Sequence, residues 1–323
     1  MFATLLGSLP APPAEAGNPL DAALEAQADA GLAPLTDGGP AWRPDREAFG
    51  VGAVVARWRA AAARTVLPVK AVLAGPYTLA REGRHGDGAA SPRARAAEAL
   101  ALAETLREAV SALAAAGCPF VEIEEALAHE IGGDEAERRA FVAAHRRLAD
   151  GAAGTHLALS IVGGSAWEAG AATILDPPYA SLAVDLVAGP ENWRLVAEAP
   201  RERGIVAGVI GARPGMPEGL DVLLYAAHYA ASTRGRGHER VGLGTAGSIA
   251  SLVWSVAVTK LERLGEAARL AASPVDAQAE AMDPRAVSPR AAALGRTRRA
   301  GARRGTGARG PHGRGPGKPS SEA

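Results

Sequence analysis

Aromatic residues and cysteine are both scarce in this sequence. Aromatic residues make up 4% of the 323 residues and hydrophobic residues 48%, so a sizeable core has to be built from Ala, Val, Leu and Ile. Cys118 is the one cysteine. A single cysteine excludes a disulfide framework, argues against a thiolate-rich metal site, and fits a reducing compartment.

Long apolar runs are also missing. No stretch reaches the roughly 20 apolar residues that a membrane-spanning helix needs, and Met1–Gly7 has neither the basic region nor the apolar run of a signal peptide. We therefore expect a cytoplasmic protein that does not enter a membrane.

The net charge of zero conceals an asymmetry. Residues 281–323 carry ten Lys and Arg against Asp283 and Glu322, a balance of +8, so the remaining 280 residues carry −8. The sequence thus combines an acidic body with a basic tail.

Short apolar or β-branched runs alternate with helical patterns along the body. The eight expected strands are Phe2–Leu6, Ala33–Thr36, Val69–Ala74, Phe120–Glu124, Thr155–Val162, Ser181–Val187, Ile205–Ile210 and Arg240–Leu243. The clearest expected helices are Ala94–Ala116, Asp134–Ala149, Glu218–Ser232 and Ile249–Ala272. Such alternation favours an α/β fold with parallel strands, and eight repeats predict a (β/α)8 TIM barrel. A doubly wound open sheet is the alternative, although no Gly-x-Gly-x-x-Gly follows the first strand.

Two regions are expected, a barrel over residues 1–275 and a disordered basic tail over residues 276–323. The tail is rich in Arg, Gly and Pro and has no periodicity, so it cannot bury enough apolar surface to fold. Its arginines could attract nucleic acid. The alternative is a solvated extension without function, because no aromatic residue is interleaved for base stacking.

Working residues of such barrels project from the C-terminal ends of the strands. That rule selects Ser8, Asp37, Pro76, Tyr77, Glu124, Glu125, His156, Asp185, Arg213 and Thr245. A pocket that unites Glu124, Glu125, His156 and Asp185 would be acidic, and it could hold a cation, bind an amine or transfer protons.

Each candidate also has a structural interpretation. The two glutamates could form ion pairs with nearby arginines, His156 could be a core histidine, and Asp185 could cap the helix that begins near Glu191. Cys118 is expected to be a small buried apolar residue.

At these positions the sequence resembles the C-terminal catalytic domain of the cobalamin-independent methionine synthase family. The segments that carry the resemblance are Leu6–Pro10, like Gly-Ser-aromatic-Pro; Leu35–Gly39, like Thr-Asp-Gly-Glu; Val69–Thr78, like Gly-Pro-x-Thr; Ala116–Glu125, like Ile-Asp-Glu-Pro; Thr155–Ala158, like Thr-His-x-Cys; and Gly242–Gly247, like a late Cys-Gly motif. They cover residues 2–272 in the order and spacing of the family.

The resemblance implies methyl transfer from a methylated folate to the thiol of homocysteine, activated by zinc. It indicates that His156 and Asp185 are the catalytic residues, which bind a metal or activate the nucleophile, and that Ser8, Asp37, Glu124 and Glu125 contact the substrate. Both positions of the zinc-binding cysteines are alanine, Ala158 and Ala246. Gly39 stands where a carboxylate would hold the substrate amine.

Two ligands are too few for a structural or catalytic zinc ion. The sequence therefore leaves open a divergent methyltransferase that acts on a small thiol or amine, and a non-catalytic barrel that binds a ligand or a partner chain. A third alternative is a relative that uses the same barrel without a thiolate metal site, as the similar uroporphyrinogen decarboxylase fold does. That enzyme needs Arg and Asp residues near its first strands, and this sequence lacks the Arg cluster there.

Overall fold

A computed structural model describes residues 1–39, 50–82, 92–215 and 217–282 of the chain. It separates into two units, residues 1–274 and 275–323. The strands of the first unit are β1 Phe2–Thr4, β2 Ala71–Ala74, β3 Phe120–Glu125, β4 His156–Ile161, β5 Ser181–Asp185, β6 Gly204–Ile210 and β7 Val241–Thr245. Its α-helices are α1 Pro19–Asp29, α2 Val51–Ala62, α3 Pro76–Glu82, α4 Pro92–Ala115, α5 Glu135–Ala149, α6 Ala171–Leu175, α7 Trp193–Glu198, α8 Leu220–Ser232 and α9 Trp254–Ala271.

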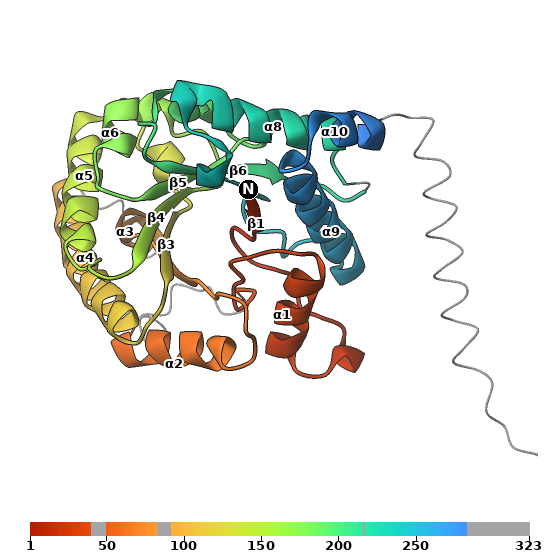
Figure 1. Cartoon of the computed structure of the whole chain (residues 1–323). Coiled ribbons are helices and arrows are strands. Elements are labelled where there is room, and N and C mark those ends of the chain that lie inside the picture. Colours follow the sequence, from red (N-terminus) through yellow and green to blue (C-terminus); the bar gives the residue numbers. More distant parts are fainter. Residues whose placement is uncertain (40–49, 83–91, 216, 283–323) are drawn as a thin grey trace, which may run out of the picture. The chain divides into compact units, whose positions relative to one another are not determined.

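Within these residues the seven strands form one parallel, curled sheet in the order β1-β7-β6-β5-β4-β3-β2, with helices outside it (Figure 1). The fold is α/β and TIM-barrel-like, as the alternation of strands and helices predicts. The expected eighth strand, Ala33–Thr36, forms only an isolated bridge, from Leu35 to Val69. Pro34 has no N–H to donate to a ladder, which limits regular pairing there.

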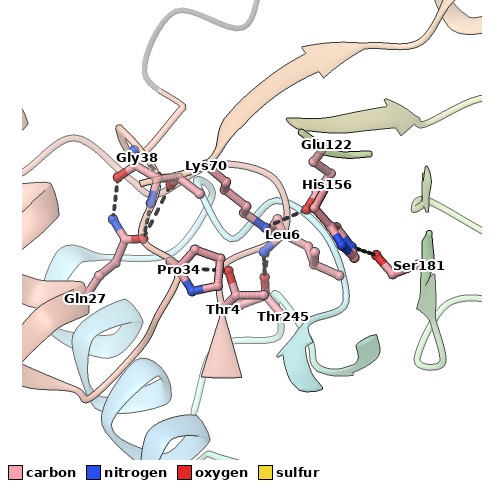
Figure 2. A network of polar contacts seen from close by, with 11 residues as sticks. Thr4, Leu6, Gln27, Pro34, Gly38, Lys70, Glu122, His156, Ser181 and Thr245 are labelled. Atoms are coloured by element: carbon pink, nitrogen blue, oxygen red, sulfur yellow. Dashed lines mark hydrogen bonds and ion pairs between the residues drawn. The ribbon is translucent and has the colours of Figure 1, made fainter. Parts of the chain in front are cut away.

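This short segment nevertheless connects the two outer strands of the sheet. The Ala33 N–H donates to the carbonyl of Ala3 at 2.9 Å, and the Lys70 N–H donates to the carbonyl of Leu35 at 2.9 Å. Thr4 Oγ1 also donates to the carbonyl of Pro34 at 2.8 Å (Figure 2). Residues 33–36 therefore fill the position of a strand between β1 and β2.

Apolar side chains are divided between the two faces of the sheet. The larger cluster joins alternate strand residues, such as Ile123 and Leu159, to the helices. The smaller cluster consists of Leu6, Val162, Ala183 and Val206, with Phe2 and Ala126 packed against it. Because successive side chains of a strand point to opposite faces, the smaller cluster belongs to the inner face of the curled sheet.

The expected long helices are confirmed by α4, α5, α8 and α9. Residues Val275–Met282 form helix α10, so a helix occupies the start of the expected tail, where the sequence predicted disorder. The Arg-rich remainder, 283–323, and with it any nucleic-acid contact, lies outside the described residues. In the described parts of the chain, no helix is both long enough and apolar enough to cross a bilayer.

Candidate functional site

A cleft opens at the C-terminal ends of the strands, where the fold predicts a site. It has about 660 Å³ of space for water-sized groups. Most of its lining is Gly, Ala and Val, and the polar side chains in it are Ser8, Glu124, Asp185 and Ser248. A mostly apolar cleft with a few polar groups is the usual form of a small-molecule site.

A second, much smaller cavity of about 20 Å³ adjoins this cleft. Its polar lining comes from Ser8, Thr36, Asp37, Arg57 and Glu124. A cavity of this size holds one water molecule or one ammonium-sized group. Three residues, Ser8, Gly39 and Glu124, line both spaces, so the two form one site with a wide apolar part and a narrow polar end.

Glu124 lies where the two spaces meet. Its side chain is buried, with 7% of the residue exposed, and its Oε2 has no hydrogen-bond partner among the described residues. Burial and the nearby charge of Glu122 raise the pKa of Glu124 to about 7, while Lys70 and the Gly7 backbone N–H oppose that rise. A carboxyl group with this pKa can exchange a proton at neutral pH.

Asp37 is held in the narrow end by an ion pair. Its Oδ2 lies 3.0 Å from Arg57 Nε, and its Oδ1 accepts from the Gly39 N–H at 3.0 Å. Gly39 has φ +65°, and a Cβ there would lie 2.8 Å from Ser8 Oγ. Since left-handed backbone and contact with Ser8 both disfavour a side chain, the narrow end has no room for a carboxylate from position 39.

Glu125 faces away from the cleft, although it follows Glu124 directly. It accepts from Tyr77 N at 2.9 Å, from Thr78 N at 2.7 Å and from Thr78 Oγ1 at 2.5 Å. His145 Nε2 lies 2.9 Å from its Oε1, and His145 Nδ1 lies 2.6 Å from the Tyr179 hydroxyl. Both oxygens of Glu125 are therefore committed to fixing α3 and α5 against β3. The structure does not bring Glu125 to the predicted substrate.

Asp185 lines the cleft, but its carboxylate mostly braces the backbone. Oδ1 accepts from the N–H groups of Val187 and Ala188, both at 2.8 Å, and Oδ2 accepts from the Gly163 N–H at 3.3 Å. Asp185 therefore caps the turn at Val187 and Ala188. The sequence allowed a similar capping role, but for the helix that begins near Glu191. Thr245 likewise joins β7 to β1 through the backbone of Leu6 (Figure 2).

His156 lies at the opposite end of the barrel from the cleft. It is the first residue of β4 and pairs in register with Phe120, whereas Glu124 pairs with Ser160. Four residues of strand separate the two levels, about 13 Å along the sheet. His156 Nε2 lies 2.8 Å from Ser181 Oγ (Figure 2), and its ring stacks on Phe120. The structure therefore does not bring His156 and Asp185 together as the expected catalytic or metal-binding pair.

Comparison with known families gives the chain its place. Residues 44–215, just over half of the 323 residues, match the sequence model described as "Cobalamin-independent synthase, N-terminal domain". The chain belongs to the cobalamin-independent synthase family. The expected family is thereby confirmed, although the matched model is that of the N-terminal domain and the motifs above were compared with the catalytic domain. No curated protein matches the chain.

Three solved structures have a fold similar to that of this chain. A B12-independent methionine synthase from Shewanella sp. W3-18-1, in complex with selenomethionine, is 16% identical with a TM-score of 0.67, over 83% of this chain and 96% of that one. A putative vitamin-B12 independent methionine synthase from Listeria monocytogenes is 15% identical with a TM-score of 0.63, over 83% and 97%. A methyltransferase from Methanosarcina mazei is 14% identical with a TM-score of 0.51, over 69% and 65%.

The residues of this family member do not fit the zinc ion that the resemblance implies. The two positions at which the resemblance places cysteine ligands are Ala158 and Ala246, His156 lies at the far end of the barrel, and the Asp185 oxygens accept backbone N–H groups. Among the residues that the structure describes, no three His, Cys, Asp or Glu side chains lie together as a metal site. Zinc needs three or four well-placed protein ligands.

We therefore expect purified protein to contain far less than one zinc per chain, measured by elemental analysis after dialysis against zinc. Replacing His156 with alanine should leave that small content unchanged. Near-stoichiometric zinc that is lost in the His156→Ala protein would contradict this account of the site.

Sequence reasoning did not find three of the charged residues near Glu124. Glu122 lies two residues before it on the same face of β3, so strand alternation could have identified it. Lys70 directly precedes the apolar strand β2, and a charged residue in that position could also have indicated a polar interior. Arg57 comes from α2, and nothing in the helix pattern indicates that it reaches Asp37.

Proposed function

We propose that this chain binds a small molecule that carries a primary amine on a compact apolar body. In this proposal the ammonium group enters the narrow polar end, between Glu124 and Asp37, and the apolar body fills the wide cleft. The observation that carries the proposal is Glu124, a buried carboxyl group with an unpartnered oxygen at the point where both spaces meet.

Charge favours an ammonium group over an anion at this point. Glu124 and Asp185 are the charged side chains of the cleft lining, and both are acidic. Among the described residues, the one cation that lines the narrow end is Arg57, which is already paired with Asp37 at 3.0 Å. In the part of the chain that the structure describes, ionised Glu124 has no comparable partner for its Oε2, so an ammonium group would supply the missing hydrogen bond and charge.

One of the similar solved structures supports an amino acid as the type of ligand. The Shewanella protein is described in complex with selenomethionine, an amino acid with a primary amine and an unbranched apolar side chain. The small side chains in this cleft, including Ala126, Ala246 and Ala250, leave space for such a body. L-Methionine and homocysteine are therefore suitable first probes.

Calorimetric titration with L-methionine tests the proposal, with 4-(methylthio)butanoic acid as the probe that lacks the amine. We expect binding of L-methionine at pH 8 and at least about thirty-fold weaker binding of the amine-free acid, because a buried charged hydrogen bond is lost. Glu124→Gln should weaken L-methionine to a similar extent. Glu202→Gln, at an exposed site outside the cleft lining, is the matched control and should bind as the unaltered protein does.

Equal binding of both probes, or an unaltered affinity in the Glu124→Gln protein, would refute the assignment of the amine to Glu124. If neither L-methionine nor homocysteine binds at millimolar concentration, an amino acid of this class is not the ligand.

Methyl transfer is the second candidate function, and the pKa of Glu124 near 7 is the observation that favours it. Ionised Glu124 could take the proton of a bound thiol, and the thiolate would then attack the methyl carbon of a methylated folate. The S–C bond forms as the N–C bond breaks, and the proton held by Glu124 passes to the folate nitrogen that leaves. Incubation with homocysteine and isotopically labelled methyltetrahydrofolate tests this candidate. Labelled methionine that is absent with the Glu124→Gln protein supports it, and its absence with the unaltered protein leaves a non-catalytic binding barrel.

The cytoplasm is the location that we propose for this function. Cys118 is buried, forms no disulfide, and its pKa is raised by burial, so the thiol is protected from oxidation and exchange. A lone protected thiol is typical of proteins from reducing compartments.

A further inference from the structure

A buried ion pair lies inside the barrel beneath the cleft. Lys70 Nζ is 2.5 Å from Glu122 Oε2, and the two side chains are 0% and 2% exposed. Figure 2 shows the two side chains pointing toward one another, Lys70 from the start of β2 and Glu122 from β3. Such a pair is costly to bury and can often be replaced by apolar residues without loss of stability. Its presence directly below the site therefore calls for an explanation.

Three unpartnered polar atoms lie on the same inner face, next to this pair. Glu122 Oε1, Glu124 Oε2 and Ser160 Oγ are all buried without a hydrogen-bond partner among the described residues. Glu122 and Glu124 alternate along β3 with Val121 and Ile123, whose side chains belong to the larger apolar cluster on the outer face of the sheet. Ser160 is the register partner of Glu124 on β4. The polar interior thus continues from the cleft down to the ion pair, and Glu124 is its upper end.

The charges around Glu124 come from several elements. Glu122 precedes it on β3, while Glu125 follows it on the outer face. Lys70 reaches the interior from the start of β2, and Asp185 faces the cleft from β5. In the narrow end lies the neutralised pair of Asp37 and Arg57. Lys70 is the cation of this set that acts on Glu124 from within the barrel, and Glu122 is the adjacent anion.

We propose that Lys70 and Glu122 are positioning residues that set the protonation state of Glu124 and, through it, the affinity of the cleft for an amine. This inference rests on the proposed function for its second half only. When an ammonium group binds, each Glu124 carboxyl that is still protonated releases its proton to solvent and becomes the carboxylate that the ligand needs. Glu122 opposes that release because its charge has the same sign, and Lys70 favours it.

The two members of the pair therefore have opposite effects on Glu124. Glu122→Gln removes the adjacent negative charge and leaves Lys70 free to stabilise ionised Glu124, so its proton should leave at lower pH. Lys70→Met removes the cation and leaves Glu122 beside Glu124, so the proton should leave at higher pH. The double variant Lys70→Met/Glu122→Gln removes both charges and should titrate close to the unaltered protein.

Carbon-13 NMR of the ligand-free protein, labelled at the glutamate carboxyl carbons, measures these midpoints directly. The Glu124 signal is assigned by its loss in the Glu124→Gln protein. We expect its midpoint near pH 7 to fall by about one unit in Glu122→Gln and to rise by about one unit in Lys70→Met, as charges a few ångströms away in a protein interior produce. If the pair has only a structural role, the Glu124 midpoint should move in the same direction in both variants or should not move in either. Either result would overturn the inference.

Two features keep the test decisive. If Lys70→Met fails to fold, two variants still test the inference. Glu122→Gln keeps the charge of Lys70 alone, and the double variant has neither charge. In a second arm, L-methionine affinity at pH 7 should rise by just under about two-fold in Glu122→Gln, because the ionised fraction of Glu124 rises from about half to about nine-tenths, and it should fall by about five-fold in Lys70→Met. Opposite NMR shifts without any ligand binding would refute the proposed function and leave the role of the pair intact, whereas binding without the shifts would do the reverse.

Discussion

Glu125→Ala is expected to lower the free energy of unfolding by about 3–5 kcal/mol, the largest stability effect that we predict for a single substitution. The carboxylate accepts from Tyr77 N, Thr78 N and Thr78 Oγ1, and it lies 2.9 Å from His145 Nε2. Its removal leaves these buried donors without a partner and opens a cavity beneath α3.

Urea denaturation followed by circular dichroism measures this loss. Glu125→Gln is the matched variant, because it keeps the volume and one acceptor oxygen, and it should lose clearly less stability than Glu125→Ala. An alanine variant as stable as the unaltered protein would show that the carboxylate does not hold α3 and α5 against β3. Gly75 agrees with this tight packing, since a Cβ there would lie 2.1 Å from the Glu125 carboxyl carbon.

Glu124→Gln is expected to raise the free energy of unfolding at alkaline pH, whereas Glu125→Ala lowers it. Because the pKa of Glu124 is raised to about 7, the folded protein keeps a proton that the unfolded chain loses near pH 4.5. The stability that this proton contributes is fully present below pH 4.5 and is lost as the pH rises through 7. At pH 8 the unaltered protein should therefore be less stable than the glutamine variant by up to about 3 kcal/mol.

Paired urea titrations at pH 4.5 and pH 8 isolate this effect. The difference between the two proteins should be small at pH 4.5 and large at pH 8, and Glu202→Gln should show no such change. A glutamine variant that is less stable than the unaltered protein at pH 8 would mean that Glu124 is held as a favourable carboxylate, contrary to our description of it.

The fold was largely predictable because its signals are local. Apolar runs that alternate with helical stretches located seven strands and the long helices without any distant information. The eighth strand, Ala33–Thr36, was reduced to a bridge, since Pro34 limits its hydrogen bonding. Helix α10 was missed because the composition of the tail as a whole concealed eight residues of helical sequence at its start.

The site was only partly predictable, because its members depend on register and on which face each residue occupies. Ser8, Asp37, Glu124 and Asp185 lie at the C-terminal end as expected, and all four line the two connected spaces. The structure places His156 at the opposite end of its strand, since a match to a short motif does not fix the level of a residue along the strand. Glu124 and Glu125 were treated as a pair, although strand alternation sends them to opposite faces.

The most direct test of the central claim, that Glu124 receives the ligand amine, is the number of protons released when L-methionine binds. Calorimetric titration at pH 7 in buffers of different ionisation enthalpy measures that number. A pKa of about 7 for Glu124 predicts the release of about half a proton per ligand at pH 7 and about a tenth at pH 8. Binding that releases no proton at pH 7, or releases the same number from the Glu124→Gln protein, would contradict the claim.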